Sequence, residues 1–196
     1  MRRLLLLTLG AIGFGGLVLL NVGGYRYGVS DQAFYIPVVL QELTPSMYPH
    51  DAPLIAAQDR FFFFDDWFAS ILRYSNISIP SGFLIGYALT LLLLFGAIVT
   101  VGRSMYTSWW TVSALAIGLT IRHQIPDTAV NTLESYFHPR LFAFSIGLCA
   151  VAAFLRGRTW LALMITGIAL LAHPTTGLWF VVFVGSAALV SDRNAR

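Results

Sequence analysis

Charge is the first thing that this sequence lacks. Of its 196 residues only 11% are Asp, Glu, Lys or Arg, while 57% are hydrophobic and the mean hydropathy is +0.74. A soluble domain usually carries about 25% charged residues, which it needs to cover its surface. The composition therefore excludes a soluble enzyme, a disordered tail and a disulfide-rich secreted module, and it predicts a membrane protein.

Cysteine and lysine are the next absences. A single cysteine, Cys149, has no partner for an intramolecular disulfide and excludes a cysteine-based metal cluster. Lysine does not occur, and all twelve basic residues are arginines. In a soluble protein a pI near 9.3 would suggest nucleic acid. Here the arginines flank apolar segments, so we expect membrane lipids as partners and no nucleic acid. Signature motifs of P-loop proteins, zinc proteases and serine hydrolases are also missing.

Long apolar runs are abundant. Two of them, Leu4–Val22 and Ile79–Val101, reach the length of about 20 residues that crosses a hydrocarbon core of about 30 Å. The first run is longer than the apolar part of a signal peptide, about 7–15 residues, so we expect an uncleaved first span. In the second run, the pair Gly82 and Gly86 allows the close approach of another helix.

Four further apolar segments have only 13 to 15 residues each, namely Trp109–Ile121, Leu141–Leu155, Trp160–Ala172 and Leu178–Val190. Flanking polar residues extend them, and Arg156-Gly157-Arg158 suits a tight turn between two of them. We therefore predict an all-α polytopic transmembrane bundle, a single integral membrane domain with about six spans at residues 4–22, 79–101, 107–122, 139–155, 159–173 and 176–190. In the alternative, some short segments are re-entrant half-helices, which protein must shield from lipid.

The distribution of charge predicts the orientation in the membrane. With six spans and the N-terminus inside, the cytoplasmic segments hold seven arginines and one acidic residue, a net charge of +6. The outer segments hold five arginines and eight acidic residues, a net charge of −3. The positive-inside rule then places both termini in the cytoplasm of a cell with the chain in its inner membrane.

The first outer loop, residues 23–78, is 56 residues long and rich in aromatic residues. Loops of this size are usually functional or disordered, and the aromatic content predicts an ordered segment on the membrane surface. Ser30 is a candidate cap for a helix starting at Asp31, which Pro37 must kink or divide. A second amphipathic stretch covers about residues 60–74.

The second outer segment is shorter. Pro126-Asp127 is a candidate helix start, and an apolar face follows at helical spacing, made of Val130, Leu133 and Phe137. The segment ends in His138-Pro139-Arg140, and a second His-Pro step at His173 separates the last two spans on the same side. These groups suit an anionic, headgroup-bearing substrate, because arginine binds phosphate in a bidentate way.

An uncleaved first span is thus followed by a long outer loop that opens with an acidic residue before aromatic ones, Ser30-Asp31-Gln32-Ala33-Phe34-Tyr35. The loop continues with the proline-punctuated stretch Tyr48-Pro49-His50-Asp51, and later spans are joined by short turns. This order of features resembles bacterial members of the GT-C class of polytopic glycosyltransferases. The resemblance covers nearly the whole chain.

The resemblance implies roles for particular residues. Asp31 would be the catalytic base or a metal ligand, holding a divalent cation such as Mg²⁺ or Mn²⁺, and Asp51 would be a second catalytic carboxylate. Arg140, with His138 and His173, would bind the phosphate of a polyprenyl-phosphate-linked sugar donor. Members of the class have about twice as many spans. The chain would therefore be a truncated product, a fragment or a small relative with only the N-terminal module, which would act with a missing C-terminal module or a partner subunit.

Each of these residues also has a structural interpretation. Asp31 suits the start of a helix, where the helix dipole stabilises a carboxylate. His138 and His173 suit polar span ends ahead of helix-starting prolines, and Arg140 suits anchoring at the interface. For the whole chain, the alternatives to a glycosyltransferase are a transporter or flippase of a lipid-linked precursor and a non-catalytic membrane subunit. The two long runs contain no charged residue, which argues against an ion pump.

Overall fold

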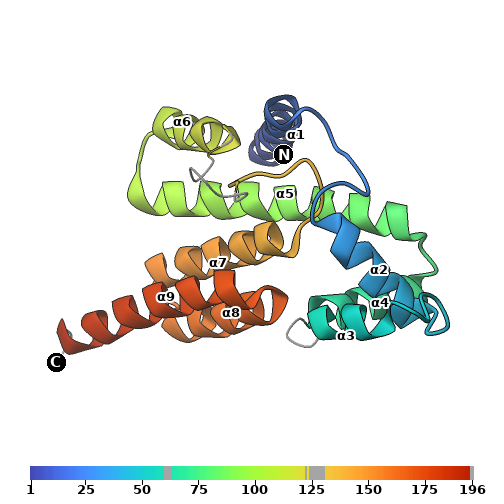
Figure 1. Cartoon of the computed structure of the whole chain (residues 1–196). Coiled ribbons are helices and arrows are strands. Elements are labelled where there is room, and N and C mark those ends of the chain that lie inside the picture. Colours follow the sequence, from blue (N-terminus) through green and yellow to red (C-terminus); the bar gives the residue numbers. More distant parts are fainter. Residues whose placement is uncertain (60–62, 122, 124–130, 195–196) are drawn as a thin grey trace.

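The computed structural model describes residues 1–59, 63–121, 123 and 131–194, and every regular element in these ranges is an α-helix (Figure 1). The all-α prediction is therefore confirmed for the part of the chain described. The helices are α1 (Arg2–Val22), α2 (Gln32–Leu43), α3 (Ala52–Asp59), α4 (Phe64–Ser75), α5 (Ile79–Met105), α6 (Trp109–Thr120), α7 (Pro139–Leu155), α8 (Thr159–Ala172) and α9 (Pro174–Asn194).

An apolar helix occupies each of the six segments predicted as spans. Three of them, α1, α5 and α9, are long and apolar enough to cross a membrane, whereas α6, α7 and α8 are shorter. At 1.5 Å per residue, the 17 residues of α7 reach about 25 Å and the 12 residues of α6 about 18 Å.

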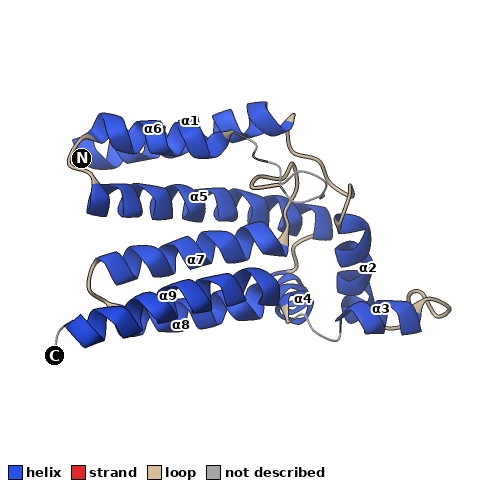
Figure 2. Ribbon diagram, turned by 60° about the vertical axis from the view of Figure 1, so that its left-hand side comes forward, coloured by secondary structure: helices blue, strands red, loops and turns tan. Residues whose placement is uncertain are grey.

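The helices form a layered bundle with α5 in the middle. Helices α1 and α6 lie on one side of α5, and α7, α8 and α9 lie on the other (Figures 1 and 2). Both termini and the turns α5–α6 and α7–α8 gather at one end of the bundle, which we call the termini end (Figure 2). Helices α2, α3 and α4 gather at the opposite end. Together with residues 131–138 they form what we call the cap.

The cap has an aromatic core, as the composition of the long loop predicts. Four buried phenylalanines, Phe64, Phe68, Phe83 and Phe137, come from α4, α5 and the loop before α7. Each ring contacts at least two of the others, with centroids 5.0 to 5.9 Å apart. Such pairs add about 0.5–1.5 kcal/mol each beyond the burial of their area. The long loop is therefore ordered by packing against the first turns of α5.

The glycine pair of α5 makes this packing possible. A Cβ atom at Gly86 would lie 2.7 Å from the ring of Phe137, and one at Gly82 would lie 2.2 Å from Leu72 of α4. The close approach predicted for this pair therefore occurs, but its partners are α4 and the loop before α7. Among the described residues, the side chains nearest to these two glycines belong to α4 and to this loop and not to a second spanning helix.

The start of α2 differs from the prediction. Ser30 does not cap the helix, because it has a φ of +51° and Asp31 is the residue at the N-cap position. Pro37 lies inside α2 without dividing it. The second amphipathic stretch is present as α4, although its predicted first residue, Arg60, lies outside the described residues.

The second outer segment also differs where the structure describes it. Residues 131–138 are irregular, and Pro126, Asp127 and Val130 lie outside the described residues. Backbone carbonyls of this segment bond to distant donors instead of to a helix of their own. Arg26 N donates to Ser135 O at 2.7 Å and Tyr87 Oη to Glu134 O at 2.9 Å. Leu133 is buried by this packing, which explains its apolar character without a helix.

Candidate functional site

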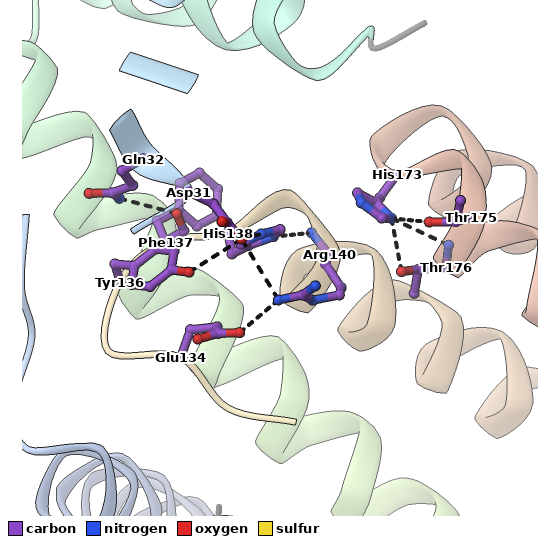
Figure 3. Close-up of polar contacts among 10 residues, drawn as sticks. All are labelled: Asp31, Gln32, Glu134, Tyr136, Phe137, His138, Arg140, His173, Thr175 and Thr176. Atoms are coloured by element: carbon purple, nitrogen blue, oxygen red, sulfur yellow. Dashed lines mark hydrogen bonds and ion pairs between the residues drawn. The ribbon is translucent and has the colours of Figure 1, made fainter. Parts of the chain in front are cut away.

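Asp31 points away from the helix that it precedes. Its side chain makes no capping hydrogen bond within α2. Instead, Oδ2 lies 2.9 Å from Nε2 of His138 and 3.5 Å from Oη of Tyr136 (Figure 3). The Asp31 side chain is 41% exposed, and among the described residues no hydrogen bond is made to Oδ1. The carboxylate is thus held by one oxygen and open at the other.

His138 holds Asp31 while it also caps α7. Its Nδ1 accepts a hydrogen bond from the backbone N–H of Arg140 at 2.9 Å, in the first turn of that helix. Because Nδ1 accepts, it carries no proton, and the neutral ring carries its proton on Nε2. That N–H donates to Asp31. Burial, reinforced by the charge of Arg140, lowers the pKa of His138 to about 4 against the opposing effect of Asp31, so the ring is neutral at pH 7.

Arg140 links two carboxylates of the cluster. Its Nη2 lies 2.7 Å from Oε1 of Glu134 and 4.0 Å from Oδ2 of Asp31 (Figure 3). The Glu134 side chain is only 7% exposed, so this ion pair is shielded from water. Among the described residues, Nη1 and Nε of Arg140 make no hydrogen bond, which leaves these donors for a ligand.

His173 repeats the pattern of His138 at the next helix junction. It follows α8 and precedes Pro174, and its Nδ1 accepts from the backbone N–H of Thr176 at 3.3 Å and from the Thr176 hydroxyl at 2.9 Å. Its ring centroid lies 6.1 Å from that of His138. Burial, together with the charge of Arg140, lowers the pKa of His173 to about 4. Both histidines are therefore neutral N–H donors at neutral pH.

A buried glutamine fixes the two loops that carry the site. Gln32 is fully buried, accepts the N–H of Gly28 at 2.7 Å and donates to Phe137 O at 3.1 Å. It therefore ties the start of α2 to the residue before His138. The ring of Tyr35, 5.4 Å from that of His138, covers the imidazole from the α2 side. Burial and the nearby carboxylates of Asp31 and Asp65 raise the pKa of Tyr35, so its hydroxyl stays protonated.

The structure brings together four of the five residues singled out in the sequence, Asp31, His138, Arg140 and His173. The fifth, Asp51, is exposed in the turn that precedes α3. Helix α2, about 18 Å long, separates this turn from Asp31, and the turn lies at the far tip of the cap in Figure 2. Within the described part of the chain, Asp51 makes no contact with the cluster.

The described residues around Asp31 offer few ligands to a divalent cation. Among them, no group of three His, Cys, Asp or Glu side chains has the arrangement of a metal site. His138 cannot ligate in this geometry, because Nδ1 accepts a hydrogen bond and Nε2 carries the proton. The guanidinium of Arg140 already lies beside both carboxylates and would repel a cation.

Glu134, Tyr136 and Gln32 belong to the cluster but were not predicted as site residues. Glu134 and Tyr136 lie within four residues of His138, just before the predicted span at 139–155. This position near the end of a span is the feature of the sequence that could have indicated them. Gln32 follows Asp31 directly, but its partner Phe137 is 105 residues away, a pairing that sequence spacing does not reveal.

Comparison with protein families, with characterised proteins and with solved structures finds no match to this chain. The resemblance to GT-C glycosyltransferases therefore stays a prediction from layout and short motifs. What the chain does must be inferred from the geometry of the cluster and from its place in the bundle.

Proposed function

We propose that the chain is a membrane-embedded glycosyltransferase module that moves a sugar from a lipid-phosphate-linked donor to an acceptor at the outer membrane face. One observation carries this proposal. A half-exposed carboxylate, Asp31, contacts the neutral His138 and lies 4.0 Å from the guanidinium of Arg140, and His173 of the α8–α9 junction packs against His138 (Figure 3). A carboxylate can take the proton of an acceptor hydroxyl, and a guanidinium can bind the phosphate of a lipid-linked donor.

The proposal includes six membrane crossings with the cap outside. Helix α6 is short, yet Thr120 in its last turn accepts hydrogen bonds from Asn21 in the last turn of α1, at 2.9 and 3.1 Å. Helix α6 therefore ends at the same depth as a helix long enough to span. Exposed tryptophans, Trp109, Trp110 and Trp160, begin α6 and α8 at the termini end, as expected for an interfacial belt.

In the proposed reaction, Asp31 is the general base. The acceptor hydroxyl attacks the anomeric carbon, and its proton passes to Oδ1 of Asp31. The bond between the anomeric carbon and the phosphate oxygen breaks, and its electron pair leaves with the lipid phosphate. Negative charge thus moves from Asp31 to the phosphate. Both groups lie within the field of Arg140, which stabilises the charge where it develops.

Arg140 would bind the donor phosphate through Nη1 and Nε while Nη2 stays on Glu134. With both histidines neutral, Arg140, Glu134 and Asp31 carry a combined charge of about −1 at pH 7. A phosphate monoanion is therefore held by directed N–H donors more than by net attraction. Proton transfer to Asp31 then removes the negative charge that competes for the guanidinium.

Replacement of Asp31 by Asn tests the proposal. The assay measures transfer of a radiolabelled sugar from a synthetic polyprenyl phosphate in membranes that contain the chain. We expect a loss of about 10²–10⁴-fold, the usual effect of removing a positioned base, with unchanged membrane insertion. Asp66→Asn, an exposed acidic residue of α4, is the matched control and should transfer normally. Asp51→Asn should cost less than Asp31→Asn. Near-normal transfer by Asp31→Asn would overturn the assignment.

A further inference from the structure

We infer that His138 is a positioning residue, which holds one oxygen of the Asp31 carboxylate and so aims the other at the acceptor. The role of Asp31 as a base rests on the proposed function, whereas the hydrogen bonds of His138 do not depend on it. The inference starts from the two ring nitrogens. Nδ1 is occupied by the backbone N–H of Arg140, and Nε2 is occupied by Oδ2 of Asp31, each at 2.9 Å. Only the Nε2–H tautomer satisfies both contacts.

The ring is also fixed by what surrounds it. The His138 side chain is 2% exposed, so water cannot take over either hydrogen bond. Tyr35 packs edge-on against it at 5.4 Å, Tyr136 lies at 5.9 Å and His173 at 6.1 Å between ring centroids. These groups come from α2, from the loop before α7 and from the α8–α9 junction. A flip of the imidazole would break both hydrogen bonds, and these surrounding rings leave no water to replace them.

Fixing His138 fixes Asp31, although Asp31 itself is half exposed. The carboxylate lies before α2 and the imidazole before α7, 107 residues apart in the sequence. Gln32 joins the same two segments through Phe137 O. Two hydrogen bonds, His138 to Asp31 and Gln32 to Phe137 O, therefore connect the start of α2 with the segment before α7. They set the position of the carboxylate relative to α7. Oδ1 is the oxygen left for a proton, and its direction follows from the held Oδ2.

A simpler role for His138 would be to cap α7 and nothing more. The two roles use different ring nitrogens, and two substitutions separate them. In His138→Asn the side-chain oxygen can replace Nδ1 as acceptor for the Arg140 N–H, but the side chain is too short to reach Asp31. In His138→Gln the longer amide can donate near the position of Nε2, but the capping geometry is lost. His138→Asn is thus the control that keeps the cap of α7, and His138→Gln is the variant that restores the hydrogen bond to Asp31.

If His138 positions Asp31, His138→Asn keeps its thermal stability and loses transfer by about 10²-fold, the effect of a misplaced catalytic group. His138→Gln should unfold at a lower temperature and yet keep transfer within about tenfold of the unmodified chain. The opposite order, with Asn active and Gln inactive, would reduce His138 to a cap and overturn the inference.

A second measurement does not depend on activity. The full chain, labelled with ¹⁵N in its histidine rings and placed in phospholipid nanodiscs, should show His138 protonated on Nε2 alone at pH 7. The Nε2 proton should shift upfield in Asp31→Ala, while His173 serves as the internal reference. An Nδ1–H tautomer, or no response to Asp31→Ala, would contradict the positioning contact. The expected spectrum in a chain that transfers no sugar would instead contradict the proposed function alone.

Discussion

At the scale of single residues, two histidines show how helix capping and site chemistry share one ring. His138 and His173 each precede a proline, and each Nδ1 accepts a backbone N–H from the first turn of the following helix. Capping occupies the lone pair of Nδ1, which a neutral histidine would need to act as a general base. The ring proton is therefore on Nε2. Both rings are therefore donors at neutral pH. Under the proposed function, proton uptake therefore falls to Asp31, the open carboxylate.

The ion pair between Arg140 and Glu134 leads to a prediction about stability. Glu134 has a side chain that is only 7% exposed and lies 2.7 Å from Arg140. Arg140→Leu leaves this carboxylate in the protein without its guanidinium, which typically costs about 3–5 kcal/mol in the free energy of unfolding. The double variant Arg140→Leu/Glu134→Leu should regain most of that loss. Denaturant titration of both variants in detergent micelles measures the difference.

Equal stability of the single and double variants would contradict this interpretation of the pair. It would mean that water or another group replaces the guanidinium at Glu134. Glu134→Leu alone completes the cycle and separates the pairwise energy from the loss of each side chain.

At the scale of the elements, the glycine pair of α5 connects packing to the site. Gly86 contacts the ring of Phe137, which lies between Tyr136 and His138 in the sequence. Gly86→Ala places a methyl group about 3 Å or less from a buried ring that has no room to move. Overpacking of this kind costs about 1–3 kcal/mol, and it pushes His138 away from Asp31. We expect a lower unfolding temperature and a weaker transfer activity.

Gly96→Ala is the matched control for that experiment, because a Cβ atom there meets nothing within 4 Å. Alanine favours a helix over glycine by about 1 kcal/mol, so Gly96→Ala should be neutral or stabilising. If both substitutions behave alike, Gly86 is not a packing position and does not hold the loop before α7.

Some elements could be predicted from sequence and others could not, for physical reasons. The segment 139–155 was predicted with the bounds that α7 has, because an apolar run that begins at a His-Pro step has a clear start. A helix starting at Pro126-Asp127 was expected to include Leu133 and Phe137, but three carbonyls of this segment accept hydrogen bonds from Arg26, Gln32 and Tyr87 instead. Such partners lie far away in the sequence and leave no local pattern.

The same distinction holds for the site. Arg140 and the two histidines could be singled out because each lies next to the end of an apolar run, and Asp31 because it is the acidic residue before the aromatic ones in the first outer loop. Glu134 was seen only as one of several outer acids, since its pairing depends on how an irregular loop folds back. Asp51 was included because of its prolines and its charge. Its separation from the cluster follows from the path of α2, which the sequence does not reveal.

At the scale of the whole molecule, the bundle has two chemically different ends. The termini end carries arginine-rich turns, with the Arg103 guanidinium 4.8 Å from the ring centroid of Trp109. The cap end carries most of the acidic residues and the candidate site. This asymmetry is what the positive-inside rule uses to orient a membrane protein, and it favours a cap that faces outward.

The orientation can be tested with single cysteines in a chain whose only native cysteine, Cys149, is replaced by alanine. Ser46 lies in the turn between α2 and α3, and Thr107 lies in the turn between α5 and α6, both exposed. An impermeant thiol reagent added to intact cells should label Ser46→Cys at once, because the cap faces outward. Thr107→Cys should react only after the membrane is permeabilised. The reverse pattern would place the cap and Asp31 in the cytoplasm, where an outer-face donor could not reach them.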